Sequence, residues 1–133
     1  MVIDASVWIS SLVVADLHHQ VSRRWLAEQI RRGDPPVVPT LALSEVAGAI
    51  ARCTGLTLLG RQAAEEMLRI PGLRLMALDG ELATEAADMA AEARLRGADA
   101  VCAATARALN LPLFTWDQDQ EERARPFVRV WRP

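Results

Sequence analysis

The sequence predicts a three-layer α/β/α fold, in which a mostly parallel sheet of about five strands is covered on both faces by helices. Short apolar runs, which are typical of buried strands, alternate along the chain with longer segments that carry apolar residues at helical spacing. Two of the short runs lead into an acidic residue, Asp4 or Asp117, and open parallel sheets bind ligands at such strand ends. The chain has 133 residues, the usual size of one domain, so we expect a single domain over residues 1–133.

The first half of the chain is expected to contain two strands and four helices. The strands are the apolar pairs at residues 2–3 and 37–38, and Pro39 stops the second of them. Ser6 and Thr40 are natural N-caps for the helices that follow the two strands. The expected helices are bounded by such caps and by glycine or proline, and they cover residues 6–13, 17–32, 40–55 and 57–70.

The second half is expected to contain two helices and three strands. Its helices, at residues 81–96 and 98–109, are separated by Gly97, and the second of them is almost entirely apolar after Asp99. Residues 116–122 are expected to form a polar turn. The expected strands are the remaining apolar runs, at residues 73–78, 111–115 and 127–131.

Composition excludes several classes of protein. No apolar run reaches the roughly 18 residues of a membrane span and no secretory signal is present, so we expect a cytoplasmic protein outside any membrane. The net charge of -2 provides no general basic field for nucleic acid. The sequence contains no lysine, so chemistry that requires a lysine is excluded. Cys53 and Cys102 lie in apolar helical patterns, and we expect two free, buried thiols.

Three acidic residues stand where the predicted fold would bring polar groups together. Asp4 and Asp117 follow apolar strands, and if those strands are neighbours their carboxylates lie a few ångströms apart. Asp99 opens an apolar helix, which must be buried and must therefore direct its polar first turn at a definite partner. Carboxylates that are brought together either take up protons or share a cation, and oxygen ligands suit Mg²⁺ or Mn²⁺. Such a site can activate water against a phosphodiester.

Each acid also has a simpler interpretation, and the residues alone leave both open. Asp4 is placed to cap the following helix, Asp99 complements the dipole of its helix, and Asp117 lies in a polar turn where acids are common. Glu45 lies roughly 120° from the centre of the apolar stripe of its helix, which favours a solvated surface residue.

The four acids occur in segments that resemble the motifs of PIN-domain ribonucleases, and the compact length is most similar to VapC-type toxins. The first segment, VIDASVW at residues 2–8, resembles the strand, aspartate and hydroxyl that open such domains. LSEV at residues 43–46 resembles the internal acidic helix, and GADAVCAATA at residues 97–106 the central aspartate before a helix of small residues. LFTWD at residues 113–117 resembles the final motif.

This resemblance implies a Mg²⁺- or Mn²⁺-dependent endoribonuclease of a type II toxin–antitoxin system. Asp4, Asp99 and Asp117 would hold the metal, and Glu45 would complete the catalytic acidic cluster. The resemblance further implies an RNA substrate, a VapB-like antitoxin and a homodimer. The resemblance also implies supporting residues, which would orient carboxylates or waters. These are Ser6 and Thr115, with Asp119 as a further candidate.

The last motif departs from the family pattern. Many relatives carry a further aspartate and a phenylalanine after the position of Asp117, whereas this chain has Gln118, Asp119 and Gln120. We favour a turn role for Asp119 over metal binding. Trp116 is expected to pack against the end of the sheet rather than to offer a stacking face to a base.

Arg107, His18 and His19 are expected to have structural rather than catalytic roles. Arg107 lies in the apolar helix and is expected to pair with an acid. His18 and His19 are adjacent, so on a helix they point about 100° apart and make a poor metal pair. We expect both at the surface.

Four alternative functions compete with this interpretation. Receiver domains and haloacid-dehalogenase-like phosphatases place acids at strand ends but need a lysine, which this chain lacks. A degenerate PIN module that binds RNA or a protein without cleavage, and a housekeeping RNA-processing PIN nuclease, remain as alternatives.

Overall fold

The computed structural model describes residues 1–133. It contains the five predicted strands and one helix more than predicted. The strands are β1 (Val2–Ile3), β2 (Val37–Pro39), β3 (Arg74–Met76), β4 (Leu113–Phe114) and β5 (Val130–Trp131). The helices are α1 (Ala5–Leu12), α2 (His19–Arg31), α3 (Thr40–Thr54), α4 (Thr57–Leu68), α5 (Gly80–Ala93), α6 (Gly97–Ala108) and α7 (Gln118–Ala124).

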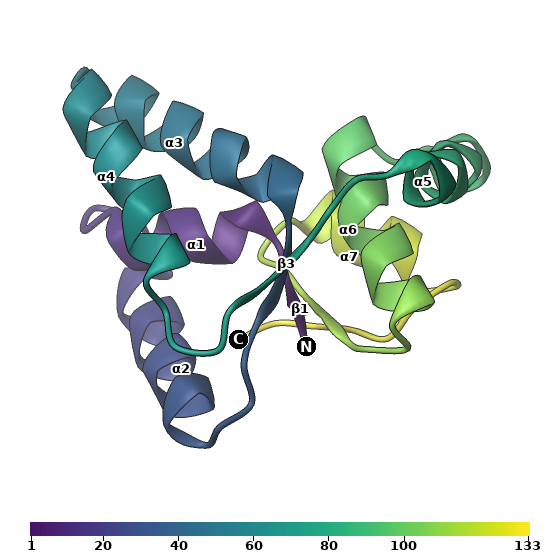
Figure 1. The fold of residues 1–133 in the computed structure, drawn as a ribbon, viewed down its shortest axis with the longest axis horizontal. Coiled ribbons are helices and arrows are strands. Elements are labelled where there is room, and N and C mark those ends of the chain that lie inside the picture. The colour runs from purple at the N-terminus through teal and green to yellow at the C-terminus, as the bar shows by residue number, and fades with distance from the viewer.

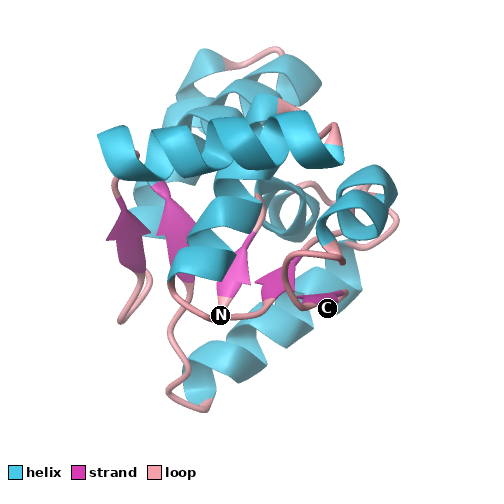
Figure 2. Cartoon of the chain, turned by 90° about the vertical axis from the view of Figure 1, so that its right-hand side faces the viewer, coloured by secondary structure: helices cyan, strands magenta, loops and turns pink.

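The strands form one sheet in the order β3-β2-β1-β4-β5, and every neighbouring pair is parallel. The first strand lies at the centre, where Val2 pairs with Val37 on one side and Leu113 on the other. Figure 2 shows the strands side by side in one row. The predicted fold class is confirmed: helices α1–α4 cover one face of the sheet and α5–α7 the other (Figure 1).

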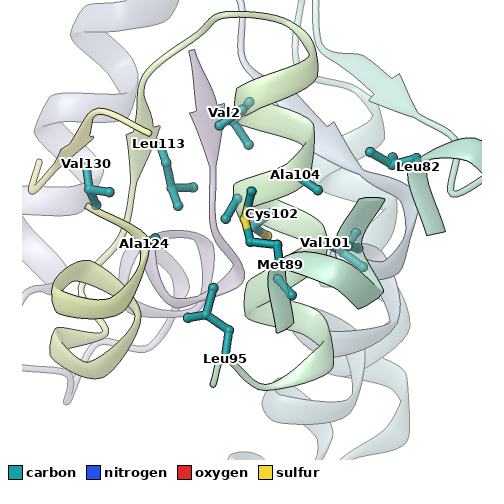
Figure 3. Close-up of a cluster of buried hydrophobic side chains, with 14 of the residues drawn as sticks. Val2, Leu82, Met89, Leu95, Val101, Cys102, Ala104, Leu113, Ala124 and Val130 are labelled. Carbon is teal, nitrogen blue, oxygen red and sulfur yellow. The ribbon is translucent and has the colours of Figure 1, made fainter. Parts of the chain in front are cut away.

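Alternation along the strands divides the apolar residues between two cores. Successive strand side chains point to opposite faces. Val2 and Leu113 therefore pack with α5, α6 and α7, as Figure 3 shows, whereas Ile3 and Val38 pack with α1 to α4. Helix α6 is buried throughout from Ala100 to Ala106, which confirms that its apolar composition reflects a central position.

Helices α3 and α4 form a tightly packed hairpin. It turns at Gly55, which takes the left-handed conformation with φ of 73° and caps α3. The contact is closest at buried Gly60, where an added Cβ atom would lie 2.4 Å from the backbone oxygen of Ala47. A residue without a side chain is required at this position.

Several boundaries differ from the prediction. The segment expected to be a polar turn after Trp116 contains α7, because the side chain of Asp117 caps a new helix and accepts a hydrogen bond from the amide of Gln120. Asp4 rather than Ser6 caps α1, and α3 begins after Pro39 with no side-chain cap from Thr40. Strands β3, β4 and β5 are shorter than predicted, β1 has the predicted length, and β2 continues through Pro39, which was expected to stop it.

Burial corrects two further expectations. Cys102 is buried as predicted, but Cys53 is exposed near the end of α3. His19 is buried rather than at the surface, with its Nδ1 atom 3.1 Å from the backbone oxygen of Ser10. Arg107 pairs with Glu85 at 2.7 Å, as its position in an apolar helix predicted. None of the seven helices combines the length and hydrophobicity required to cross a membrane.

Candidate active site

The acidic residues meet at the carboxyl ends of the two central strands. Strands β1 and β4 are neighbours, with Ile3 paired to Phe114, and the amide of Asp4 donates to the backbone oxygen of Phe114 at 3.0 Å. Asp4 follows the first of these strands and Asp117 follows the second by three positions. Each carboxylate caps the helix that leaves its strand. Asp4 and Asp117 therefore do both things expected of them: each caps a helix, and the two lie at the same edge of the sheet.

Asp4 is buried and is held by three donors. Its Oδ2 atom accepts hydrogen bonds from the amide of Ser6 at 2.9 Å and from the hydroxyl of Thr115 at 3.2 Å. The thiol of Cys102 donates to Oδ1 at 3.6 Å. Because a carboxylate oxygen accepts each of these bonds, the set fixes the side chain in one orientation.

The hydroxyls of Ser6 and Thr115 join the two strand ends into one network. Their oxygens lie 3.2 Å apart. Ser6 Oγ accepts the amide of Trp116 at 3.0 Å, and Thr115 Oγ1 accepts the amide of Asp117 at 3.0 Å. The hydroxyl of Thr115 thus contacts Asp4 and Asp117 directly, and the hydroxyl of Ser6 contacts the residue before Asp117. Such contacts can hold carboxylates in place, as a supporting role requires.

Asp117 and Asp119 differ in their surroundings. The Oδ2 atom of Asp117 remains partly exposed, with Arg96 Nη1 at 3.7 Å as its nearest cationic contact. Asp119 lies in the first turn of α7 and forms an ion pair with Arg123 at 2.7 Å. This pairing favours the structural role for Asp119, although a helix rather than a turn carries it.

Asp99 carries a buried oxygen that lacks a partner. Its Oδ2 atom makes no hydrogen bond, while Gln120 Nε2 donates to the backbone oxygen of Asp99 at 3.3 Å. Burial raises the pKa of Asp99 to about 6, and the charges of Asp4 and Asp117 act in the same direction. An unpartnered buried oxygen is costly, and a proton or a cation at this position would offset that cost.

Glu45 projects from α3 toward the same acids. Burial raises its pKa to about 7, with the charges of Asp4 and Asp99 as further causes. The helical wheel had favoured a solvated surface position, and that inference is wrong because the side of α3 away from the apolar stripe faces the acidic cluster. The structure thus brings together all four predicted acids.

The donor set fits a hard divalent cation such as Mg²⁺ or Mn²⁺, since it consists of carboxylate oxygens. No three His, Cys, Asp or Glu side chains are grouped closely enough to coordinate one ion as they stand. Mutual repulsion of carboxylates opposes a tighter grouping until a positive charge lies between them.

A cavity of about 370 Å³ opens over this cluster. Asp4, Glu45 and Asp117 line it together with Ser6 and Arg52. A larger cavity of about 560 Å³ lies between the end of α6 and β5, but it contains no acidic residue. We therefore assign function to the smaller one.

Several residues at or beside the site carried no recognisable signal in the sequence. Cys102 was expected to be a buried thiol, and its contact with Asp4 depends on a pairing across the fold. Gln120 belonged to the expected turn.

Trp116 packs as predicted: its ring stacks on His18 with centroids 3.8 Å apart, and its Nε1 donates to Ser22 Oγ at 2.7 Å.

The metal-free protein is expected to lose stability as the pH rises from about 4 to 7. The pKa values of Asp99 and Glu45 are raised to about 6 and about 7 in the folded state, whereas the unfolded chain releases both protons near pH 4. The folded state binds more protons in this window, so the free energy of unfolding falls through it. Both side chains contact solvent, and after discounting for this we expect a loss of about 1–3 kcal/mol.

Urea denaturation of EDTA-treated protein at pH 5 and pH 8 measures this effect. The Glu45→Gln variant, which has no proton to lose, should gain stability relative to the parent between the two pH values. An equal difference between parent and variant at both pH values would contradict the prediction.

Comparison with known proteins identifies a family and solved structures that share this architecture. The sequence matches the family model of the PIN domain over residues 1–126. It matches no protein among the curated sequences. The fold is similar to that of VapC20 of Mycobacterium tuberculosis, described as a sarcin-ricin loop cleaving toxin, with 20% identity and a TM-score of 0.81 over 97% of each chain.

Two further solved structures share the fold. VapBC2 of Rickettsia felis, bound to a DNA fragment from its promoter, is 12% identical, with a TM-score of 0.75 over 98% of this chain and 96% of the other. FitAcB from Neisseria gonorrhoeae is 19% identical, with a TM-score of 0.73 over 98% and 95%. At these identities the likeness concerns the fold.

Proposed function

This chain belongs to the PIN domain family, and we propose that it is a Mg²⁺- or Mn²⁺-dependent endoribonuclease, the toxin of a type II toxin–antitoxin pair. The observation that carries the proposal is the meeting of Asp4, Glu45, Asp99 and Asp117 at one sheet edge. The unpartnered Oδ2 of Asp99 and the two raised pKa values indicate a site that is incomplete without positive charge.

Asp4, Asp99 and Asp117 are the residues proposed to hold the ion. A divalent cation supplies charge that stabilises a phosphodiester under attack and makes water more acidic. Asp4 contributes a rigid carboxylate, because the amide of Ser6 and the hydroxyl of Thr115 fix it. Asp99 contributes an oxygen that no protein donor occupies.

Glu45 is proposed to exchange a proton at the acidic cluster. A carboxyl group with a pKa of about 7 is divided between its two protonation states near neutral pH, which suits a general acid or base. It lines the cavity on the side formed by α3, opposite the strand ends that carry Asp4.

The proposed partners are RNA, a VapB-like antitoxin and a second copy of the chain in a homodimer. The solved structures with this fold include VapBC and FitAB proteins, which supports a toxin–antitoxin setting. Large apolar side chains that are mostly exposed on and between the helices α1 to α4 also support a protein partner. They are Val14, Leu17, Leu56, Leu58 and Leu68.

Incubation of purified, antitoxin-free protein with mixed cellular RNA tests the proposal. We expect cleavage fragments in the presence of Mn²⁺ or Mg²⁺ and none after addition of EDTA, with activity restored when excess Mn²⁺ is supplied. Sequencing of the fragment ends would identify the RNA and the cleaved bond. Intact RNA under every metal condition would contradict the proposal and favour a non-catalytic PIN module.

A further inference from the structure

One positively charged side chain, that of Arg52, lines the acidic cavity. The other charged residues in its wall are Asp4, Glu45 and Asp117. Arg96 lies outside this wall and is paired with Asp117 at 3.7 Å, so Arg52 is the cationic residue of the lining itself. The chain has no lysine, so a positive contact for phosphate at this place falls to arginine.

Arg52 is also free to bind. It makes no ion pair and donates no hydrogen bond, although three carboxylates line the same cavity, and its side chain is exposed. Other arginines that have a carboxylate nearby are paired with it: Arg107 bonds Glu85, and Arg123 bonds Asp119. The guanidinium of Arg52 therefore keeps its donors available for a ligand.

The geometry of α3 directs this side chain toward the acids. Arg52 lies seven positions after Glu45, which places both residues on one face of the helix, two turns apart. Its Nη1 atom lies back over Gly48, only 3.0 Å from where a Cβ atom of that residue would be. The glycine leaves the space that the guanidinium occupies. The charged group thus lies near the level of Gly48, three residues or roughly 4.5 Å along the helix axis from Glu45.

From these observations we propose that Arg52 binds a phosphate of the RNA backbone beside the acidic cluster. The inference rests on the proposed function and deepens it. A guanidinium offers two parallel donors to the oxygens of a phosphodiester, which fixes both position and orientation. Arg52 is therefore a substrate-binding residue that holds the strand in register over the acidic cluster.

The test measures RNA affinity in a protein that cannot cleave. In an Asp99→Asn background, binding of a short labelled single-stranded RNA is followed by fluorescence anisotropy over a range of salt concentrations. Arg52→Gln should weaken binding about tenfold and reduce the slope of log affinity against log salt by about 0.7, the value for one phosphate contact. Arg52→Lys keeps the charge and should retain the slope while losing part of the affinity.

Arg74→Gln is the matched control. This arginine is also exposed and unpaired, but it opens β3, at the end of the sheet opposite the cavity. Its replacement should leave both affinity and slope unchanged. Circular dichroism of each variant verifies the fold.

The outcomes separate this inference from the proposed function. A parent protein that cleaves RNA, together with an Arg52→Gln variant of unchanged affinity and slope, overturns the role of Arg52 alone. Loss of affinity that is equal in Arg52→Gln and Arg74→Gln overturns it as well, since a general charge effect explains that result. A parent that neither binds nor cleaves RNA overturns both.

Discussion

Replacement of Asp99 by asparagine is expected to reduce metal-dependent RNA cleavage by about 10³-fold. The amide has the volume of the carboxyl group but carries no charge, so the proposed divalent ion would lose one of its charged ligands. The same change should stabilise the metal-free protein at pH 8, because it removes a carboxylate whose pKa is raised by burial to about 6. Initial cleavage rates with Mn²⁺, together with thermal denaturation in EDTA, measure the two effects.

Two variants make the result specific. Asp88→Asn removes an exposed acid of α5 away from the cavity and should leave both rate and stability unchanged. Asp4→Asn should also abolish cleavage, but it should lower stability, because Asp4 accepts hydrogen bonds from three donors that an amide satisfies less well. Cleavage by Asp99→Asn at the parental rate would remove Asp99 from the site.

Replacement of Gly60 by alanine is expected to reduce the free energy of unfolding by about 2–4 kcal/mol. The new Cβ atom would lie 2.4 Å from the backbone oxygen of Ala47, so α3 and α4 would have to separate. This cost exceeds the gain of about 1 kcal/mol that alanine brings to a helix interior. Urea denaturation gives the change directly.

Gly80→Ala provides the control for helix propensity. Gly80 begins α5, and an added Cβ atom meets nothing within 4 Å. This variant should be neutral or slightly more stable than the parent. If Gly60→Ala and Gly80→Ala unfold at the same urea concentration, close helix packing does not explain the glycine at position 60.

The fold was predictable because local pattern and global architecture agree. The apolar pairs Val2-Ile3 and Val37-Val38 are rich in β-branched residues and are followed by helix-capping or breaking residues, which favours strands, and the helical segments between strands indicate parallel crossovers. The order of the strands was beyond prediction, since pairing of β1 with both β2 and β4 depends on contacts far apart in the chain. Helix α7 was missed because its N-cap, Asp117, also reads as a turn residue.

The candidate site was predictable in part. Asp4, Asp99 and Asp117 had positional reasons to meet, and the structure brings them together. The assignment of Glu45 to the site depended on family resemblance, because periodicity cannot distinguish a helix face turned to solvent from one turned to a polar cavity. Nothing in the sequence indicated that Arg52 lies at the site. Its position there depends on its spacing from Glu45 along α3 and on the space left by Gly48, and neither feature forms a recognised motif.

The central position of β1 in the sheet has a consequence during synthesis of the protein. A ribosome releases the amino end first, yet Asp4 reaches its hydrogen-bond partner Thr115 only across a separation of 111 residues. A nascent chain therefore carries its first carboxylate long before β4 exists to complete the edge. Closure of so long a loop is slow relative to helix formation. The acidic cluster is thus assembled only after β4 and the residues that follow it, Thr115 to Asp117, have left the ribosome.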